Sequence, residues 1–437
     1  MNIIVIFRFV TSEIRRFCSD NSGGIMVFVG VTLSAILGFA GLGVDVANLY
    51  SERRATQSMA DAAAISGTYA DISTAGDHTA VEQAAISEAT RNGYVASGTN
   101  AIQVAIVPNS GLPQPIRPRV EVMVQREISL VFLRMFVAGP TQTVAARAIG
   151  GWRHLGPMCV IALEETEAGA LTFSGSTTAN VSCGVASNSS SSSAINISGN
   201  ATLVANPAQA YGDISISGSG QLVSNYPPLP HSPRVSDPYE NEVFPPAPST
   251  CDLASLTVSP GTTVNINAGG GSFKICGDLT VRGTLNLGPG TYYVSGGDVD
   301  FRASSNVSGT DVTLVMTGST PSNVGDIHIN GGANVDLEAP DSGPYESIVI
   351  FVDPIADRQL NRLNGGSSMS LLGVVYAPSQ DLEFNGGTGT GGCTQLIART
   401  ITFSGNSFIE NTPALCANVG LNLGSDETGQ RQVVLVE

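Results

Sequence analysis

The stretch INISGNATLVANPAQAYGDISISGSGQLVS, residues 195–224, contains one short unit twice. Each copy is an alternating apolar strand, a Ser-Gly turn and a second alternating stretch, and the turn glycines Gly199 and Gly218 lie 19 positions apart. Further copies begin at Leu171, Ile327, Leu382 and Ile401. A period of about twenty residues with short strands and glycine turns is typical of a β-solenoid.

The repeats therefore predict a right-handed parallel β-helix, whose coils stack at about 4.8 Å. A β-sandwich is the alternative. We assign residues 153–437 to this domain, because the sequence changes near Trp152 from Ala-rich to rich in Gly, Ser, Thr and Asn. Residues 226–250 carry eight prolines and cannot form a central strand or a helix. We expect them to form an extended excursion that packs on the solenoid or links two halves of it.

The cysteines support the solenoid independently. Residues one coil apart lie above one another, at the separation of about 4.4–6.8 Å between Cα atoms that a disulfide requires. Taken in sequence order as three successive pairs, the six cysteines beyond Trp152 are 24, 25 and 23 positions apart within each pair. This spacing favours bridges between neighbouring coils, although six cysteines allow fifteen pairings. Zinc is the competing interpretation, and no C-x-x-C motif or Cys/His cluster supports it. The six are Cys159, Cys183, Cys251, Cys276, Cys393 and Cys416.

Residues 23–44, GGIMVFVGVTLSAILGFAGLGV, contain no charged side chain. As a helix they would be about 33 Å long, enough to cross a bilayer core of about 30 Å. We interpret them as a single transmembrane helix. A signal peptide cleaved after Ala40 and a buried soluble helix are the alternatives. Residues 1–22 contain three arginines, so the positive-inside rule makes them a cytoplasmic leader and places the rest of the chain across the membrane.

The predicted membrane helix carries small residues at offsets of four, four and three: Gly30, Ser34, Gly38 and Gly41. Such a row allows close approach of another helix, so these residues are candidates for packing against a partner in the membrane. The ordinary glycine content of membrane helices is the alternative explanation.

Residues 45–152 predict a helical stalk and a small α+β neck. No proline interrupts the sequence from Asp45 to Ala70, and Asp77 can cap a second helix. Alternating apolar residues then predict strands separated by a Pro-rich turn. The expected elements are helices 45–70 and 77–92, strands 102–107, 120–125 and 143–149, and a short apolar segment 128–137.

The junction of the predicted span and stalk has an ordered set of motifs. Gly41-Leu42-Gly43-Val44-Asp45 is followed by Tyr50, Arg53-Arg54 and Gln57, and then by an Ala-Asp-Ala-Ala-Ala helix that contains Asp61. This order resembles the N-terminal domain of TadG-like proteins of the tight-adherence (Flp) pilus assembly system. The resemblance implies a bacterial inner-membrane protein whose body lies in the periplasm, with other pilus-assembly or secretion-platform proteins as partners.

The composition and charge exclude some functions. The net charge of −16 argues against nucleic acid, whose phosphates demand a basic surface. Solenoids can carry polysaccharide-cleaving sites, and acids near one face could serve one. Period-two acids on a strand are more often its solvated face, and Asp278 and Arg282, which recur as Asp298 and Arg302, suggest stacked ion pairs. The candidate groups are Asp278, Arg282, Asp298, Asp300, Arg302, Asp326, His328, Asp336 and Glu338.

We find no catalytic constellation, metal motif or cofactor motif in the sequence. Asp213-Ile214-Ser215-Ile216-Ser217 has the letters of a D-x-S-x-S metal site but lacks the buried strand before it and the helix after it. We therefore expect a protein that acts by binding in the assembly or presentation of a pilus, with a Ser/Thr/Asn-rich solenoid side for a glycan or surface ligand. A carbohydrate-active β-helix enzyme or a secreted adhesin on the same anchor is the alternative.

Overall fold

A computed structural model of the 437-residue chain describes residues 23–74, 76–107, 117–137, 139–154, 157–181, 183–225, 227–364, 369–385, 388–390, 392–405, 407–409, 413–421 and 431–436. The expected leader, residues 1–22 with Cys18, lies outside this part. The chain divides into two compact units: residues 1–153 with 431–437, and residues 154–430.

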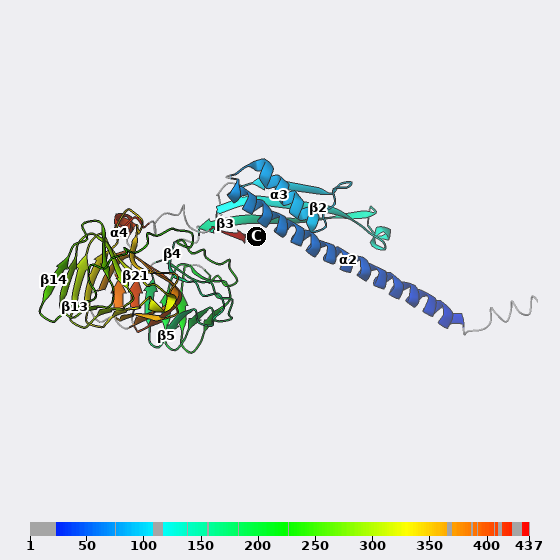
Figure 1. The fold of residues 1–437 in the computed structure, drawn as a ribbon. Coiled ribbons are helices and arrows are strands. Elements are labelled where there is room, and N and C mark those ends of the chain that lie inside the picture. Colours follow the sequence, from blue (N-terminus) through cyan, green and yellow to red (C-terminus); the bar gives the residue numbers. More distant parts are fainter. Residues whose placement is uncertain are drawn as a thin grey trace, which may run out of the picture. The chain divides into compact units, whose positions relative to one another are not determined.

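The first unit is built on one long helix, α2 (Gly23–Ser73), of 51 residues. Figure 1 shows α2 extending well beyond the sheet that covers its C-terminal part. The extension is the apolar segment 23–44, and its large side chains are exposed, including Met26 at 83% and Phe39 at 76%. By length and composition this helix can cross a membrane. The expected span and stalk therefore form one continuous helix.

The rest of the first unit, the neck, is a small sheet covered by helices. Strands β1 (Ala101–Ile106), β2 (Arg117–Ser129) and β3 (Thr141–His154) are antiparallel neighbours, and a short 3-10 turn η1 (Leu133–Met135) follows β2. Helix α3 (His78–Arg91) begins at Asp77, whose carboxylate accepts a hydrogen bond from the backbone N–H of Thr79 at 2.9 Å.

The neck core is made largely of small side chains. Ala60, Ala63 and Ala64 of α2 are completely buried together with Val120 and Val122 of β2. Gly150 of β3 allows this close approach, because an added Cβ would collide with the Thr68 hydroxyl and the Ala64 carbonyl of α2. The Ala-rich sequence of the stalk thus serves to dock α2 tightly on the sheet.

The last strand of the chain, β30 (Arg431–Leu435), belongs to the neck and not to the solenoid. It lies beside β3 at the edge of the neck sheet, where the N–H of Val436 donates to the carbonyl of Ile149 at 2.9 Å. The expected boundary of 153–437 therefore needs correction at its C-terminal end. The solenoid is an insertion between two strands of the neck sheet.

The second unit is a parallel β-solenoid of about ten coils, as the repeats predicted, and its short strands form three faces. We number its faces in chain order. In stacking order, the first face contains β13 (Leu256–Val258), β16 (Leu279–Val281), β19 (Val299–Phe301), β22 (Ile327–Ile329), β25 (Leu360–Asn364), the end of β26 (Met369–Asn385), the end of β28 (Thr394–Ser404), β5 (Leu171–Ser174), β8 (Ile195–Ile197) and β11 (Ile214–Ile216).

The other two faces follow the same order. The second contains β14 (Thr263–Ile266), β17 (Thr284–Leu287), β20 (Asn306–Gly309), β23 (Asn334–Glu338), the start of β26, β27 (Thr388–Thr390), β29 (Ser407–Ile409), β6 (Thr178–Val181), β9 (Thr202–Val204) and β12 (Gln221–Val223). The third contains β15 (Ser272–Ile275), β18 (Gly290–Ser295), β21 (Val312–Thr317), β24 (Ile348–Val352), the middle of β26, the start of β28, β4 (Met158–Ala162), β7 (Gly184–Ser187) and β10 (Ala208–Ala210).

The turn glycines of the repeats stack as the sequence period indicated. Gly175, Gly199 and Gly218 have φ angles of 76°, 71° and 68°, a left-handed conformation that favours glycine. An added Cβ on Gly199 would lie 2.8 Å from the carbonyl oxygen of Gly175 in the coil below. Glycine is therefore required both by the turn and by the contact between coils.

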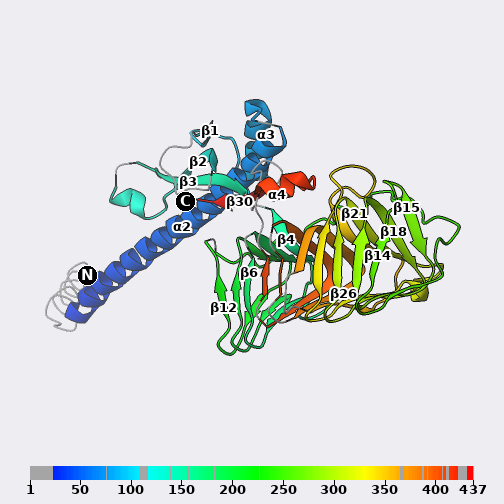
Figure 2. The same cartoon turned by 90° about the vertical axis from the view of Figure 1, so that its left-hand side faces the viewer.

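The coils do not stack in chain order. Strands β28 and β29, near the end of the solenoid sequence, pair with β4, β5 and β6 at its beginning. The chain thus enters at the middle of the stack, winds outward to β12, crosses to β13 at the opposite end and winds back to the middle (Figure 2). We call the contact between β28–β29 and β4–β6 the seam.

The Pro-rich excursion makes the crossing between the two ends. Parallel bridges tie Leu229 to Gln209 at one end of the stack and Leu253 to Ile275 at the other. Between them the excursion packs on the outer side of the third face, where Tyr239 and Phe244 contact the aromatic side chains of that face. Strands β4 and β24 are buried at every residue, because the core covers one side of them and the excursion the other.

Candidate interaction surfaces of the anchor helix and the solenoid

Asp45, at the end of the apolar segment of α2, fixes the loop that follows β2. Its carboxylate accepts hydrogen bonds from the backbone N–H groups of Phe132 and Leu133, both at 2.6 Å, and of Val131 at 3.2 Å. These bonds, above all the one from Leu133, hold the pKa of the Asp45 carboxyl below its usual range. Asp45 is therefore a structural clamp in the neck, with 3% of its surface exposed.

Gln57 and Asp61 also act within the neck. The Gln57 side-chain amide donates to the Asp61 carboxylate at 2.7 Å and to the carbonyl oxygen of Arg147 in β3 at 3.0 Å. One turn earlier, Glu52 forms an ion pair with Arg126 of β2 at 2.7 Å. The side of α2 that carries Glu52 and Gln57 therefore contacts strands β2 and β3 of the neck sheet.

Tyr50, Arg53 and Arg54 lie on exposed parts of α2. Tyr50 is 66% exposed, and the Arg54 guanidinium lies 6.0 Å from the centre of the Tyr50 ring. Among the described residues, neither Arg53 nor Arg54 takes part in an ion pair. They lie about 14 Å along the helix beyond Val44, so they present cationic and aromatic groups just outside the apolar segment.

The small residues of the apolar segment separate into two groups. An added Cβ on Gly30 or Gly38 would meet no atom within 4 Å, and the Ser34 hydroxyl donates to the Gly30 carbonyl at 2.8 Å. Gly41 is different, because the Phe132 ring covers it, with ring atoms 2.6 Å from an added Cβ. The open row is therefore Gly30, Ser34 and Gly38, while Gly41 serves the packing of the neck.

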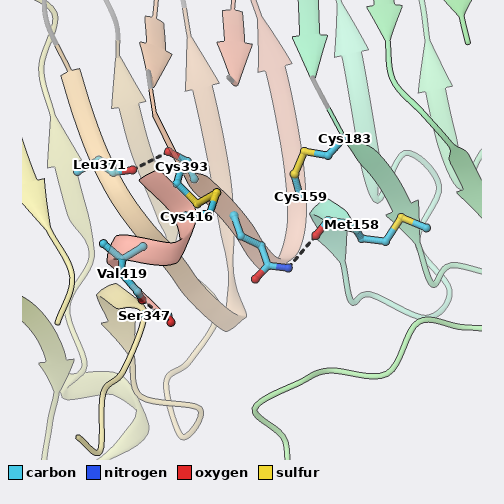
Figure 3. The surroundings of a disulfide bond; sticks show 10 residues. Met158, Cys159, Cys183, Ser347, Leu371, Cys393, Cys416 and Val419 are labelled. Atoms are coloured by element: carbon cyan, nitrogen blue, oxygen red, sulfur yellow. Dashed lines mark hydrogen bonds between the residues drawn. A yellow bond between two sulfur atoms is a disulfide. The ribbon is translucent and has the colours of Figure 1, made fainter. Parts of the chain in front are cut away.

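The six solenoid cysteines form three disulfides in sequence order. Cys159–Cys183 joins neighbouring coils at β4 and β7, with Cα atoms 5.7 Å apart. Cys251–Cys276 fastens the excursion to the end coil at the same separation. Cys393–Cys416, with Cα atoms 5.0 Å apart, fastens the short helix α4 (Pro413–Asn418) beside β28 (Figure 3). One of the three disulfides therefore joins two neighbouring coils, and the other two fasten the excursion and helix α4 to the solenoid.

The acids considered for catalysis form a ladder along the stack. Asp278 accepts a hydrogen bond from the N–H of Asp298 at 3.1 Å, and Asp298 accepts one from the N–H of Asp326 at 3.2 Å. His328 lies 3.7 Å from Asp326, whose pKa is raised mainly by burial. Asp278 and Asp298 thus each bind the backbone of the next coil.

The remaining candidate acids lie elsewhere on the solenoid. Asp300 pairs with Arg302 of its own coil, and not with a basic residue stacked above it. Asp336 and Glu338 are on the second face, where they line a hollow of about 350 Å³, and burial raises the pKa of Glu338. The structure therefore does not bring these two acids together with Asp326 and His328 of the first face.

An ion-pair network at the seam had no signal in the sequence. Arg399 of β28 contacts Glu164 at 2.7 Å and Glu167 at 3.2 Å, and also pairs with Asp381. Arg358 joins the same cluster through Glu167 at 2.7 Å and Asp381 at 2.9 Å. The arginines and Glu164 are about 200 positions apart in the sequence, so only the order of the coils brings them together.

A second feature that the sequence did not reveal is a hollow of about 530 Å³ between the excursion and the third face. Phe244, Tyr293, Tyr345 and Phe351 line it, together with Lys274, whose ammonium group donates to the Pro248 carbonyl at 2.6 Å. Its walls come from segments far apart in the sequence, and no local pattern could have indicated it.

Residues 23–77 match the family model described as "Putative Flp pilus-assembly TadE/G-like". The match covers α2 as far as the N-cap of α3, and it confirms the resemblance that the motifs from Gly41 to Gly67 indicated. No curated protein and no solved structure matches the chain.

Proposed function

We propose that this protein is a membrane-anchored component of a Flp (tight-adherence) pilus assembly system, with its neck and solenoid in the periplasm, and that it acts by binding. The observation that carries the proposal is the family match on α2. That one helix combines an exposed apolar segment of membrane-spanning length with a stalk docked on the neck sheet.

The anchor helix offers two surfaces for protein partners. Within the membrane, the row of Gly30, Ser34 and Gly38 leaves room for a neighbouring helix. Outside it, Tyr50, Arg53 and Arg54 are exposed, whereas the other motif residues are engaged with the neck. An acidic surface on another assembly protein is the partner that fits this cationic and aromatic patch.

The solenoid suits presentation or ligand binding. On its second face polar side chains form ladders across coils: Asn286 donates to Asn265 at 2.7 Å, and Ser308 donates to Asn286 at 3.1 Å. Regularly spaced amides and hydroxyls on a flat, exposed face are suited to the hydroxyl groups of a glycan. The alternative enzyme receives less support, because Asp278 and Asp298 bind the backbone of neighbouring coils. The acids Asp336 and Glu338 lie on a different face from His328.

The experiment that tests the proposal locates the intact protein. Surface fibres are sheared from the cells of the source bacterium, the membranes are separated, and each fraction is probed with an antibody to the solenoid while the mass of the protein is recorded. Full-length protein confined to the inner membrane supports an anchored assembly factor. A shortened form in the fibres would instead make the protein a processed pilin or secreted adhesin and contradict the retained anchor.

A further inference from the structure

We propose that the loop of residues 131–137, VFLRMFV, which we call the tip loop, inserts into the membrane interface beside the anchor helix. The occupant of its apolar surface is the lipid bilayer. This inference rests on the proposed membrane anchoring of α2, and it adds a second point of contact that fixes how the neck stands on the membrane.

The tip loop exposes an unusual concentration of large apolar side chains. Within seven residues, Met135 is 75% exposed, Phe136 70%, Val131 54% and Val137 43%. A soluble surface normally places such side chains singly, and a contiguous group marks a site of contact with a partner or a membrane. Their transfer from water into the bilayer would be favourable, because it removes apolar surface from water.

The position of the loop is fixed by contacts with α2. The Phe132 ring lies on Gly41, and Asp45 holds the N–H groups of three successive loop residues. The tip loop therefore cannot swing away from the helix without breaking these hydrogen bonds. Within two residues of Gly41 or Asp45 in the sequence, the helix itself exposes the apolar side chains of Phe39, Val44 and Val46.

This position coincides with the edge of the membrane. The segment 23–44 is about 33 Å long and the hydrocarbon core about 30 Å thick, so Gly41 and Val44 lie at the boundary of that core. Aromatic side chains are favoured at this depth, and the exposed Arg134 of the loop is long enough to reach the headgroups. The Glu52–Arg126 ion pair lies about 10 Å farther along the helix, in the aqueous region.

A second copy of the chain or another protein would also cover an apolar loop. The bilayer is favoured because the loop is fixed at the level of Phe39 and Val44, exposed side chains of α2 that must face lipid if the helix spans the membrane.

Quenching of tryptophan fluorescence by brominated lipids tests the inference on the full-length chain. The chain has one tryptophan, so Trp152→Phe provides a silent background. Phe136→Trp is added for the loop, Phe39→Trp for the anchor and Val243→Trp, at a side chain 93% exposed on the solenoid excursion, as the control. Each protein is reconstituted into phosphatidylcholine–phosphatidylglycerol vesicles whose acyl chains carry bromine near the carbonyl end or deeper.

We expect Phe136→Trp to be quenched most by bromine near the carbonyl end, and Val243→Trp not to be quenched. Adding Met135→Asp to Phe136→Trp should reduce its quenching and leave that of Phe39→Trp unchanged. If Phe39→Trp is quenched and Phe136→Trp is not, the tip-loop inference is wrong while the anchor stands. If neither is quenched, the anchoring itself is wrong and the inference fails with it.

Discussion

The side-chain amide of Gln395 donates a hydrogen bond to the carbonyl oxygen of Met158, 237 positions earlier in the sequence, at 2.7 Å (Figure 3). Gln395 is in β28, and Met158 begins β4, the first strand of the solenoid. This contact joins the two arms of the solenoid at the middle of the stack, where the first arm begins and the second arm ends. The parallel pairing of Leu396 with Val160 continues the strand ladder of the third face across the seam.

The seam explains how the solenoid can be inserted in the neck sheet. The chain leaves the neck after β3 and returns to it at β30, so both ends of the solenoid must be available to one small domain. An ordinary solenoid would place its ends at opposite extremes of the stack. Here the excursion connects the extremes, and both ends emerge at the middle.

Removing Arg399 should destabilise the solenoid strongly. Its side chain is 14% exposed and contacts Glu164, Glu167 and Asp381. Arg399→Ala therefore takes a largely buried cation away from three carboxylates, of which Glu167 and Asp381 keep only the more exposed Arg358. We expect a loss of about 2–4 kcal/mol in the free energy of unfolding, measured by urea denaturation. Arg362→Ala is the control, because the Arg362–Glu383 pair is more exposed and should contribute less than about 1 kcal/mol. Equal effects of the two substitutions would contradict a special role of the seam.

The sequence predicted the solenoid well but not the order of its coils. The repeat length and the turn glycines are set by the stacking of one coil on the next. A short stretch of sequence that contains Gly199 and Gly218 is therefore enough to predict a solenoid. The pairing of Leu396 with Val160 depends on the closure of the whole stack, which no local pattern encodes. The continuous apolar runs of β4 and β24 on the third face carry no alternation that identifies a strand, because both sides of these strands are buried.

The sequence identified the motif residues of α2, but it did not show which of them contact the neck and which remain exposed. Asp45, Gln57 and Asp61 belong to one set with Tyr50 and Arg53 in the sequence. Only the fold distinguishes those that bind the neck from those that remain exposed. The covering of Gly41 by Phe132 depends on a loop about ninety residues away, so the sequence placed Gly41 on the membrane-packing row.

Removing a disulfide should weaken the attachment of the excursion. Cys251–Cys276 closes a segment of 25 positions, and loss of such a bridge costs about 3 kcal/mol in the chain-entropy model. We expect the double variant Cys251→Ser, Cys276→Ser to unfold at lower urea concentration and to be cut by protease within residues 227–255 before the coils are cut. Cys18→Ser, outside the solenoid, is the control and should change neither property. Simultaneous cutting of coils and excursion would contradict this order of stability.

The tyrosines beneath the excursion should make the solenoid sensitive to alkali. Tyr376 donates to the Asp237 carboxylate of the excursion at 2.8 Å, and burial raises the pKa of Tyr376, Tyr345 and Tyr239. In the unfolded chain these phenols ionise near pH 10, whereas the folded solenoid keeps them protonated. The free energy of unfolding should therefore fall as the pH rises above about 10. Tyr376→Phe should reduce this slope, and an unchanged slope would show that Tyr376 ionises equally in both states.

The Asp45 clamp should show the opposite dependence on pH. Its pKa is lowered in the folded state, so its contribution is present above the unfolded pKa, near 3.8, and is lost as the pH falls through the folded value. Asp45→Asn should remove this acid-dependent part and reduce hydrogen-exchange protection at Phe132 and Leu133. Asp77→Asn is the control, because Asp77 caps a different helix and should leave those two amides protected. Unchanged protection in Asp45→Asn would mean that the Phe132–Gly41 packing alone holds the loop.

The exposed arginines of the stalk should affect assembly without affecting the fold. Arg53 and Arg54 lie on the surface of α2, so Arg53→Ala with Arg54→Ala should change the free energy of unfolding by less than about 0.5 kcal/mol. If they contact an acidic partner, the same variant should lose co-purification with other pilus-assembly proteins and reduce the yield of sheared fibres. Arg91→Ala on α3 is the matched control, since Arg91 is 77% exposed and lies outside the motif.

Arg53→Lys with Arg54→Lys separates charge from geometry, because lysine keeps the charge and loses the planar, stacking guanidinium. Full assembly by the alanine variant would exclude this patch as the partner site and leave the row of Gly30, Ser34 and Gly38 as the surface to test.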